Sequence, residues 1–332
     1  MSTPRVLLAL SPRLVPDLLP GPVLAQLTAV ADCDPRLVVT DWEAAAAELA
    51  NAEVLLTGWG CPWIGAEVLA AAPALRAVVH AAGSVKHHLD PVVFSRGIAV
   101  SSAAEANARP VAEYAVAAIV LARKRVFARA REYAAGTAPP DYVPAEDAGS
   151  YRATVGIVGA SRIGRLTCRL LAGYDVDLLV ADPYLDPAGA AALGASLVDL
   201  DTLCATADVV SLHAPDLPET RHLLDTGRLA LLRDGAVLVN TARGSLVDTE
   251  ALVGHCAAGR IDAVLDVTEP EPLPAGHPLL HLPNVLVSPH LAGARGNELR
   301  RLGEFAVAEI TRLARGEPLA GEIRGDDLAR IA

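Results

Sequence analysis

Three short polar segments each follow an apolar run, and between them they hold an arginine, a glutamate and a histidine. The segments are 240–244, 266–272 and 288–293, and the three residues are Arg243, Glu271 and His290. A guanidinium can bind a carboxylate through two parallel hydrogen bonds and polarise the adjacent carbonyl. An imidazolium can give that carbonyl a proton, and a carboxylate can orient the imidazole and favour its charged form. These groups suit the reduction of a 2-oxoacid by a hydride donor.

Each residue also has an ordinary structural alternative. Arg243 could form a salt bridge, Glu271 could be a solvated loop acid, and His290 could be a histidine with satisfied hydrogen bonds. The carboxyl ends of neighbouring parallel strands meet at one edge of a sheet, where ligands bind. The joint placement of the three residues at such ends therefore favours a site.

Residues 154–164, with the sequence TVGIVGASRIG, predict a buried strand, a tight turn and the start of a helix. Gly159 would permit the turn, and Gly164 would let helix and strand pack closely. The helix N-terminus would offer N–H groups to a pyrophosphate. Ser161 stands where the dinucleotide-binding fingerprint G-x-G-x-x-G has its second glycine.

A second strand, 177–181, ends at Asp182, about 20 residues after the first turn glycine. This spacing favours a dinucleotide site over a glycine turn that binds nothing. A carboxylate at this position accepts hydrogen bonds from the ribose 2′-OH and repels a 2′-phosphate, which predicts NAD rather than NADP.

Short apolar strands alternate with Ala- and Leu-rich helical segments along the chain, as in helix-covered parallel sheets. The predicted strands are 6–10, 37–39, 54–56, 77–80, 98–100, 155–158, 177–181, 207–213, 236–241, 262–266 and 285–288. The predicted fold class is α/β with two doubly wound parallel-sheet domains. A Rossmann NAD-binding domain, residues 105–294, is inserted in a flavodoxin-like substrate domain, residues 1–104 plus 295–332.

Three further segments shape this arrangement. One long helix is predicted to begin at Asn107 as its cap, with Pro110 in its first turn, and to continue through Val126. The loop 136–150, rich in proline, glycine and acidic residues, is either a surface connection or an arm that a second subunit covers. The last helix, 296–315, has one apolar face, which we expect to cover the first domain.

The composition excludes several classes of protein. The 332 residues are enough for two domains, and the formal charge of −11 argues against nucleic acid or an anionic membrane surface as a partner. Five scattered cysteines without C-x-x-C spacing predict reduced thiols in the cytoplasm and no metal site. The apolar run 5–10 predicts a first strand rather than a signal peptide, and no run has the roughly 18 apolar residues of a membrane span.

Two loops follow strands of the first domain. The loop 58–63 holds Trp59 and Trp63, which either pack between domains or line the substrate. The loop 81–88 contains serine, lysine and two histidines, so it offers more polar chemistry.

On these residues the chain resembles the D-isomer-specific 2-hydroxyacid dehydrogenase family, clearly from about residue 100 to 315 and more loosely before that. The resemblance is carried by residues 159–164, 207–215, 219–223, 239–244, 266–272 and 288–290. It implies NAD as cofactor and a small 2-oxoacid or D-2-hydroxyacid as substrate, such as glyoxylate, hydroxypyruvate or phosphoglycerate. It also implies a homodimer built around the helix near Asn107.

By this resemblance Arg243, Glu271 and His290 match the family's catalytic residues. Glu271 is preferred because it precedes a proline and lies five residues after Asp266, but Glu269 also precedes a proline and is the alternative. The predicted cofactor-binding residues are Gly159, Ser161, Arg162, Ile163, Asp182, Thr241, Ala242, Asp266 and His290.

The resemblance also implies that the substrate is bound by the backbone N–H groups of Ser84 and Val85, by Asn107 and by Arg243. The loop departs from the family at Val85 and His87, where glycine and aspartate are usual. This departure leaves the substrate open, and the neighbouring lysine indicates an additional acidic group on it.

Two other functions are compatible with this fold. Relatives act as dinucleotide-sensing corepressors, which bind partners through surface clefts, and the intact catalytic residues favour an enzyme instead. Formate-type dehydrogenases pair the histidine with glutamine, so Glu271 argues against that branch.

Overall fold

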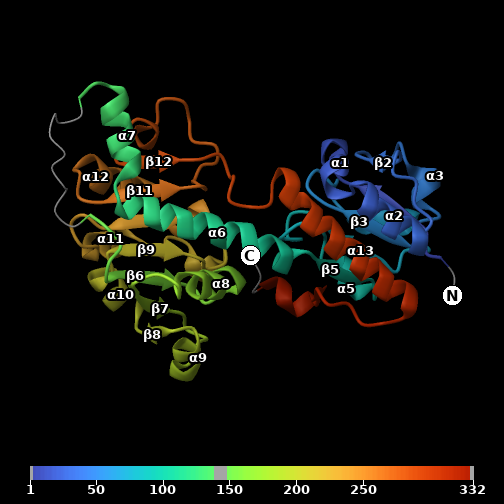
Figure 1. Cartoon of the computed structure of the whole chain (residues 1–332). Coiled ribbons are helices and arrows are strands. Elements are labelled where there is room, and N and C mark those ends of the chain that lie inside the picture. The colour runs from blue at the N-terminus through green and yellow to red at the C-terminus, as the bar shows by residue number, and fades with distance from the viewer. Residues whose placement is uncertain (1–2, 138–147, 330–332) are drawn as a thin grey trace. The chain divides into compact units, whose positions relative to one another are not determined.

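The computed structural model describes residues 3–137 and 148–329 (Figure 1). The chain divides into two compact units, 1–108 with 294–332 and 109–293. The boundary between residues 108 and 109 therefore lies inside a helix, four residues beyond the domain boundary predicted at residue 104. The centre of the predicted loop 136–150 lies outside the described residues, so its two interpretations stay open.

The first unit contains a six-stranded sheet in the order β13-β5-β4-β3-β1-β2. Its strands are β1 Val6–Ala9, β2 Val38–Val39, β3 Val54–Thr57, β4 Ala77–His80, β5 Ala99–Ser102 and β13 Glu322–Ile323. Its helices are α1 Val15–Leu18, α2 Gly21–Val30, α3 Ala46–Leu49, α4 Ala66–Ala71, α5 Val92–Ser95 and α13 Leu299–Arg315. β1, β3 and β4 are buried along their whole length, as the continuous apolar runs predict for strands covered on both faces.

The strand β13 was not predicted, and it pairs antiparallel with β5, so this sheet is not wholly parallel. It follows a turn held by Glu309 of α13, a carboxylate only 1% exposed. Glu309 accepts hydrogen bonds from the backbone N–H groups of Ala320 and Gly321 and from the hydroxyl of Ser101. A two-residue strand fixed by such distant contacts leaves no periodic pattern in the sequence.

The helix α13 packs beside α1 and α2 in the first unit, as the red ribbon in Figure 1 shows. Its predicted apolar face is buried at Leu302 and Ile310. A Cβ at Gly303 would overlap the carbonyl group of Leu18, so the close approach to α1 needs glycine there. The helix ends at Gly316, which adopts the left-handed conformation at φ 70°.

The second unit contains a seven-stranded parallel sheet in the order β12-β11-β10-β9-β6-β7-β8. Its strands are β6 Ala153–Val158, β7 Val176–Ala181, β8 Ala195–Leu197, β9 Val209–Leu212, β10 Val237–Asn240, β11 Asp262–Leu265 and β12 Val285–Val287. Its helices are α7 Val126–Ala134, α8 Arg162–Leu171, α9 Pro187–Ala192, α10 Leu200–Thr206, α11 Thr226–Leu231 and α12 Thr249–Ala257. Separate apolar cores lie on the two faces of the sheet, so the α/β doubly wound prediction is confirmed.

Three details of the predicted long helix are wrong, and one is that Pro110 lies inside the helix rather than in its first turn. The helix α6 spans Ala104–Arg123, so Asn107 lies inside it, and Asn107 N–H donates to the carbonyl of Ala103. Asn107 therefore does not cap the helix. The helix also ends before Val126, because Arg125 adopts the left-handed conformation and α7 starts afresh after it.

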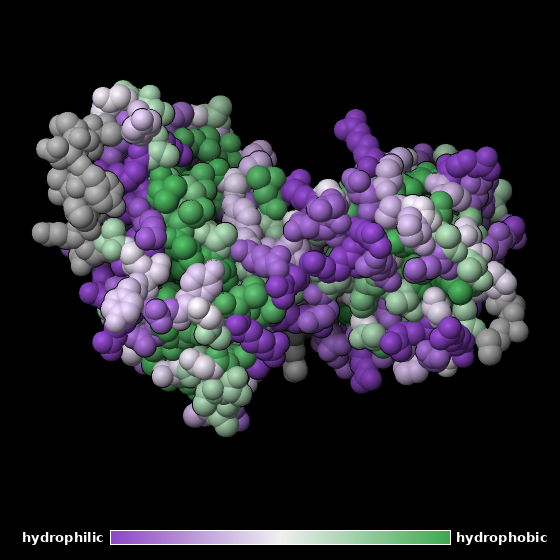
Figure 2. Space-filling model, in the orientation of Figure 1, coloured by the Kyte–Doolittle hydropathy of each residue, from purple (hydrophilic) through white to green (hydrophobic). Residues whose placement is uncertain are grey.

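On the face of the second unit visible in Figure 2, apolar surface gathers where Figure 1 places α6 and α7. Leu121 and Val126 are 42% and 37% exposed there. None of the described helices is both long enough and apolar enough to span a membrane.

Candidate active site

The turn between β6 and α8 has the geometry of a dinucleotide cradle. Gly159 has φ 94°, and a Cβ on it would overlap the backbone of Ala214. A Cβ on Gly164 would overlap the carbonyl oxygen of Gly159, so both positions require glycine. Arg162 and Ile163 form the first turn of α8, whose N-terminus points at this cradle. The N-terminus of α8 therefore lies beside a tightly packed glycine turn, as the predicted pyrophosphate position requires.

Ser161, which replaces the second glycine of the fingerprint, is the N-cap of α8. Its hydroxyl accepts a hydrogen bond from the N–H of Gly164 at 3.3 Å. Serine is a preferred N-cap residue, so the departure from the fingerprint has a structural reason that helix-capping preferences could have predicted.

Asp182 lies directly after β7, and its carboxylate faces the glycine turn. One oxygen accepts from the N–H of Ala160 at 2.6 Å, and the other accepts from the N–H of Tyr184 at 2.8 Å. Each carboxylate oxygen has further lone pairs, so the two backbone contacts orient the group and leave it able to accept from ribose hydroxyls.

The structure brings Glu271 and His290 together. Glu271 Oε1 lies 2.7 Å from His290 Nδ1, and the two side chains are 42% and 53% exposed. A polar contact this exposed contributes little to the stability of the fold, but its geometry can orient the imidazole ring. His290 has φ 54°, an uncommon conformation for a residue other than glycine.

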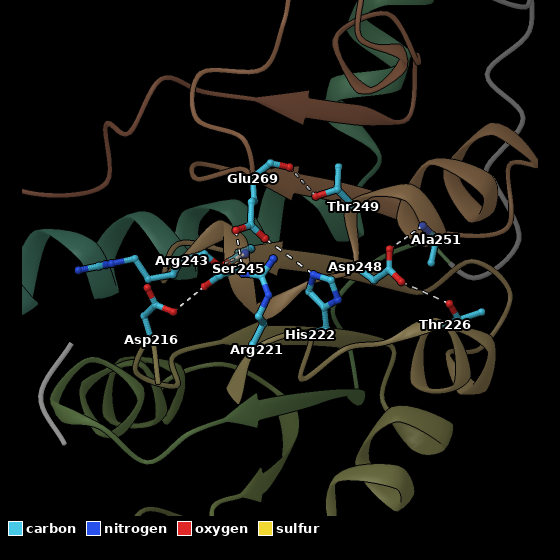
Figure 3. A network of polar contacts seen from close by, with 11 residues as sticks. Asp216, Arg221, His222, Thr226, Arg243, Ser245, Asp248, Thr249, Ala251 and Glu269 are labelled. Carbon is cyan, nitrogen blue, oxygen red and sulfur yellow. Dashed lines mark hydrogen bonds and ion pairs between the residues drawn. The ribbon is translucent and has the colours of Figure 1, made fainter. Parts of the chain in front are cut away.

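Glu269, the alternative partner for His290, is held in a different cluster (Figure 3). Its carboxylate binds Arg221 at 2.9 Å and lies 3.8 Å from the ring of His222, while its carbonyl accepts from the hydroxyl of Thr249. The geometry therefore pairs His290 with Glu271. The Arg221 contact could not be foreseen, because the two residues are 48 positions apart.

Arg243 follows β10 and is half-buried. The side chain of Asn240 shapes the turn, because its carbonyl oxygen accepts from Ala242 N–H at 3.0 Å and its amide donates to Arg243 O at 2.8 Å. Burial lowers the pKa of the Arg243 guanidinium, while the charges of Asp216 and Glu271 oppose that shift. The Arg243 side chain extends away from Glu269 and its partners Arg221 and His222 (Figure 3).

Two other predicted cofactor residues, Thr241 and Asp266, lie in the same region and are buried, as is Ala242. The Thr241 hydroxyl has no hydrogen-bond partner among the described residues, which suits a polar group of a bound ligand. The Asp266 carboxylate is turned toward the loop that carries His290, where it accepts from the N–H groups of Leu291 and Ala292.

The predicted substrate residues Ser84, Val85 and Asn107 belong to the first unit, whereas the predicted catalytic residues belong to the second. The Val85 side chain is fully buried, and the Ser84 hydroxyl accepts from the N–H of Lys86. Asn107 accepts from the N–H of Ala294 at 3.0 Å. Their role in substrate binding stays a prediction.

Sequence reasoning missed a buried polar pair at the ends of β3 and β4. Thr57 Oγ1 lies 2.9 Å from His80 Nδ1, and the His80 ring lies 4.8 Å from the ring of His88 between centroids. A histidine ending an apolar strand was the available signal. Within residues 3–137 and 148–329, no group of three or more His, Cys, Asp or Glu side chains is arranged to hold a metal ion.

The chain has recognisable relatives. Residues 116–292 match the NAD-binding domain of the D-isomer specific 2-hydroxyacid dehydrogenases. A D-3-phosphoglycerate dehydrogenase of Mycobacterium bovis is 37% identical over 264 residues, 79% of this chain and 48% of that protein. A glyoxylate reductase of Thermofilum pendens is 35% identical over 268 residues, 76% of each chain. This chain thus spans about half the length of the phosphoglycerate dehydrogenases that it matches.

Solved structures share the fold over nearly the whole length. The TT0316 protein of Thermus thermophilus superposes with a TM-score of 0.77 at 30% identity, covering 96% of this chain and 99% of that one. The D-mandelate dehydrogenase of Rhodotorula graminis gives 0.81 at 23% identity, covering 97% and 98%. At that identity the second similarity shows the fold alone.

Proposed function

Because the chain belongs to the D-isomer specific 2-hydroxyacid dehydrogenase family, we propose that it is an NAD-dependent oxidoreductase that interconverts a small 2-oxoacid and its D-2-hydroxyacid. The observation that carries the proposal is the 2.7 Å contact between Glu271 and His290 in the same unit as the glycine turn. Relatives named glyoxylate reductase and D-3-phosphoglycerate dehydrogenase support a substrate of this size.

In this proposal His290 is the proton donor for reduction and the proton acceptor for oxidation. Its Nδ1 faces Glu271, so Nε2 is the atom that exchanges the proton with the substrate oxygen. Glu271 holds the ring in place. Arg243 binds the substrate carboxylate and polarises the carbonyl, a task for which its planar guanidinium is suited and an ammonium is not.

NAD, when bound, supplies or accepts the hydride. We assign its pyrophosphate to the turn of Gly159 and Gly164 and its ribose to Asp182, whose negative charge disfavours the 2′-phosphate of NADP. The first unit would bind the substrate carboxylate through the loop of Ser84 and Val85.

We also propose that the protein is a cytoplasmic homodimer. The five free thiols, four of them buried, support a reducing compartment. The exposed apolar side chains of Leu121 and Val126 support a subunit contact at α6 and α7. Size-exclusion chromatography with light scattering would test the dimer, and a monomer at micromolar concentration would contradict it.

The test of function is NADH consumption with a panel of small 2-oxoacids, including glyoxylate, hydroxypyruvate and pyruvate, repeated with NADPH. We expect at least one 2-oxoacid to be reduced, with NADH preferred, and His290→Ala to abolish turnover while NADH binding persists. Tight NADH binding by the wild-type protein without reduction of any 2-oxoacid would favour a dinucleotide-sensing binding protein instead.

A further inference from the structure

Several hydrogen bonds hold the loop 288–292, which carries His290, to Asp266 directly after β11. The backbone N–H of His290 donates to the carbonyl of Asp266 at 2.9 Å. The Asp266 carboxylate, 1% exposed, accepts from the N–H of Leu291 at 2.7 Å and from that of Ala292 at 2.8 Å. Because His290 has a positive φ, its conformation depends on such surrounding contacts.

Two hydroxyl groups extend this anchor to the helix α6. Ser288 Oγ lies 2.6 Å from Asp266 Oδ1, and Tyr114 OH lies 2.6 Å from Ser288 Oγ. An ionised carboxylate only accepts hydrogen bonds, so the Ser288 hydroxyl donates a hydrogen bond to Asp266. The Tyr114 hydroxyl must then donate a hydrogen bond to Ser288 Oγ. Burial raises the pKa of Tyr114, and the charge of Asp266 adds to the shift, which keeps the phenol protonated for this purpose.

We propose that Tyr114 and Ser288 are positioning residues that hold the His290 loop, through Asp266, in the orientation that proton transfer needs. The inference rests on the proposed function. Asp266 carries a buried charge that three donors stabilise, and Ser288 is the only side chain among these three. Tyr114 lies on a 20-residue helix, so the chain of hydrogen bonds ties a loop to a rigid element.

The test compares Ser288→Ala, Ser288→Thr, Tyr114→Phe and the double variant in steady-state kinetics. We expect Ser288→Ala to lower kcat about 10- to 100-fold, the effect of a small displacement of a catalytic group, while KM for NADH stays within about twofold. Tyr114→Phe should lower kcat by up to about tenfold, the effect of one lost hydrogen bond. The double variant should resemble Ser288→Ala, because Tyr114 acts only through Ser288.

Ser288→Thr retains the hydroxyl and should restore most of kcat, which a loss of stability alone would not explain. The matched controls are Tyr174→Phe and Ser196→Ala, which lie before β7 and within β8, away from this loop, and both should keep wild-type kcat. Unchanged kcat in Ser288→Ala and Tyr114→Phe would overturn the proposal. So would an equal loss in Ser288→Ala and Ser288→Thr.

Amide hydrogen exchange separates this proposal from the proposed function. In Ser288→Ala the amides of Leu291 and Ala292 should exchange about tenfold faster or more, while those of β6 stay protected. If the wild-type protein reduces no 2-oxoacid, the proposed function fails, and this measurement still decides whether the loop is anchored as described. Unchanged exchange of both amides would refute the anchor.

Discussion

Lowering the pH from 7 to 5 should destabilise the first unit, because His80 stays neutral in the folded protein. Burial lowers the pKa of His80 from 6.5 to about 3, and the neighbouring His88 adds to the shift. The unfolded chain takes up a proton near pH 6.5, whereas the folded chain does not until about pH 3. The unfolded state therefore binds more protons over this range, and stability falls as the pH falls. The loss is about 1.4 kcal/mol per pH unit well below 6.5, or about 2 kcal/mol between pH 7 and pH 5.

Urea unfolding followed by tryptophan fluorescence measures this effect in the correct part of the protein. All three tryptophans, Trp42, Trp59 and Trp63, belong to the first unit, so the signal reports on that unit. His80→Gln keeps an amide that can bond the hydroxyl of Thr57 and removes the titrating ring. We expect its free energy of unfolding to vary about 2 kcal/mol less than that of the wild type between pH 7 and pH 5.

The matched control is His87→Gln. The ring of His87 is exposed and lies seven residues after His80, so this variant should retain the wild-type pH dependence. His88 is also expected to contribute with the same sign, because burial lowers its pKa. A wild-type unfolding free energy that stays level over this range would refute the reasoning. A parallel loss of stability in His80→Gln and the wild type would refute it as well.

Three further changes test the site and the packing around it. In steady-state kinetics, Glu271→Gln should lower reductive kcat/KM about 100-fold or more. Glu269→Gln should keep kcat/KM within about fivefold of the wild type, because it loses only a partly exposed ion pair. The reverse order would show that Glu269 is the partner of His290. Gly164→Ala should lower the free energy of unfolding by about 1–3 kcal/mol and weaken NADH binding, since its methyl group overlaps the turn carbonyl; unaltered urea unfolding and NADH titration would contradict this. Glu309→Ala should lower the free energy of unfolding of the first unit, followed by tryptophan fluorescence, by about 3–5 kcal/mol, because it removes a buried carboxylate that accepts from three donors. A loss below about 1 kcal/mol would show that the turn before β13 does not depend on Glu309.

The sheet strands were predictable because parallel strands covered on both faces must be continuous apolar runs. β4, predicted at residues 77–80, has those bounds in the structure. β8 and β13 were not predictable, since three and two residues are too short to establish a period. The break at Arg125 was missed for a related reason: a single left-handed residue interrupts a helix without changing the helical pattern on either side.

Asn107 shows how a helix-capping preference fails when the side chain bonds a residue that is distant in the sequence. Asparagine is a good N-cap, which is why the sequence predicts a helix start there. Its side chain instead accepts from the N–H of Ala294, 187 positions away, and the helix begins earlier. Such a partner becomes available only after the chain has folded, so no window of sequence around residue 107 contains it.

The order of the strands explains why Arg243, Glu271 and His290 are expected at one edge of the sheet. β12, β11 and β10 are neighbours in the sheet, and they are followed by His290, Glu271 and Arg243 respectively. Parallel neighbours present their carboxyl ends at one edge, so residues that follow such strands converge whatever the length of chain between them. The same order places β9 beside β6, and the connections from these two strands leave in opposite directions along the sheet. The crevice where the strand order reverses is where an open α/β sheet binds its ligand, and the glycine turn opens at that point. The strand order by itself leaves both Glu269 and Glu271 open, because both follow the same strand. The family resemblance favours Glu271, and in the folded protein Glu269 binds Arg221 while Glu271 contacts His290.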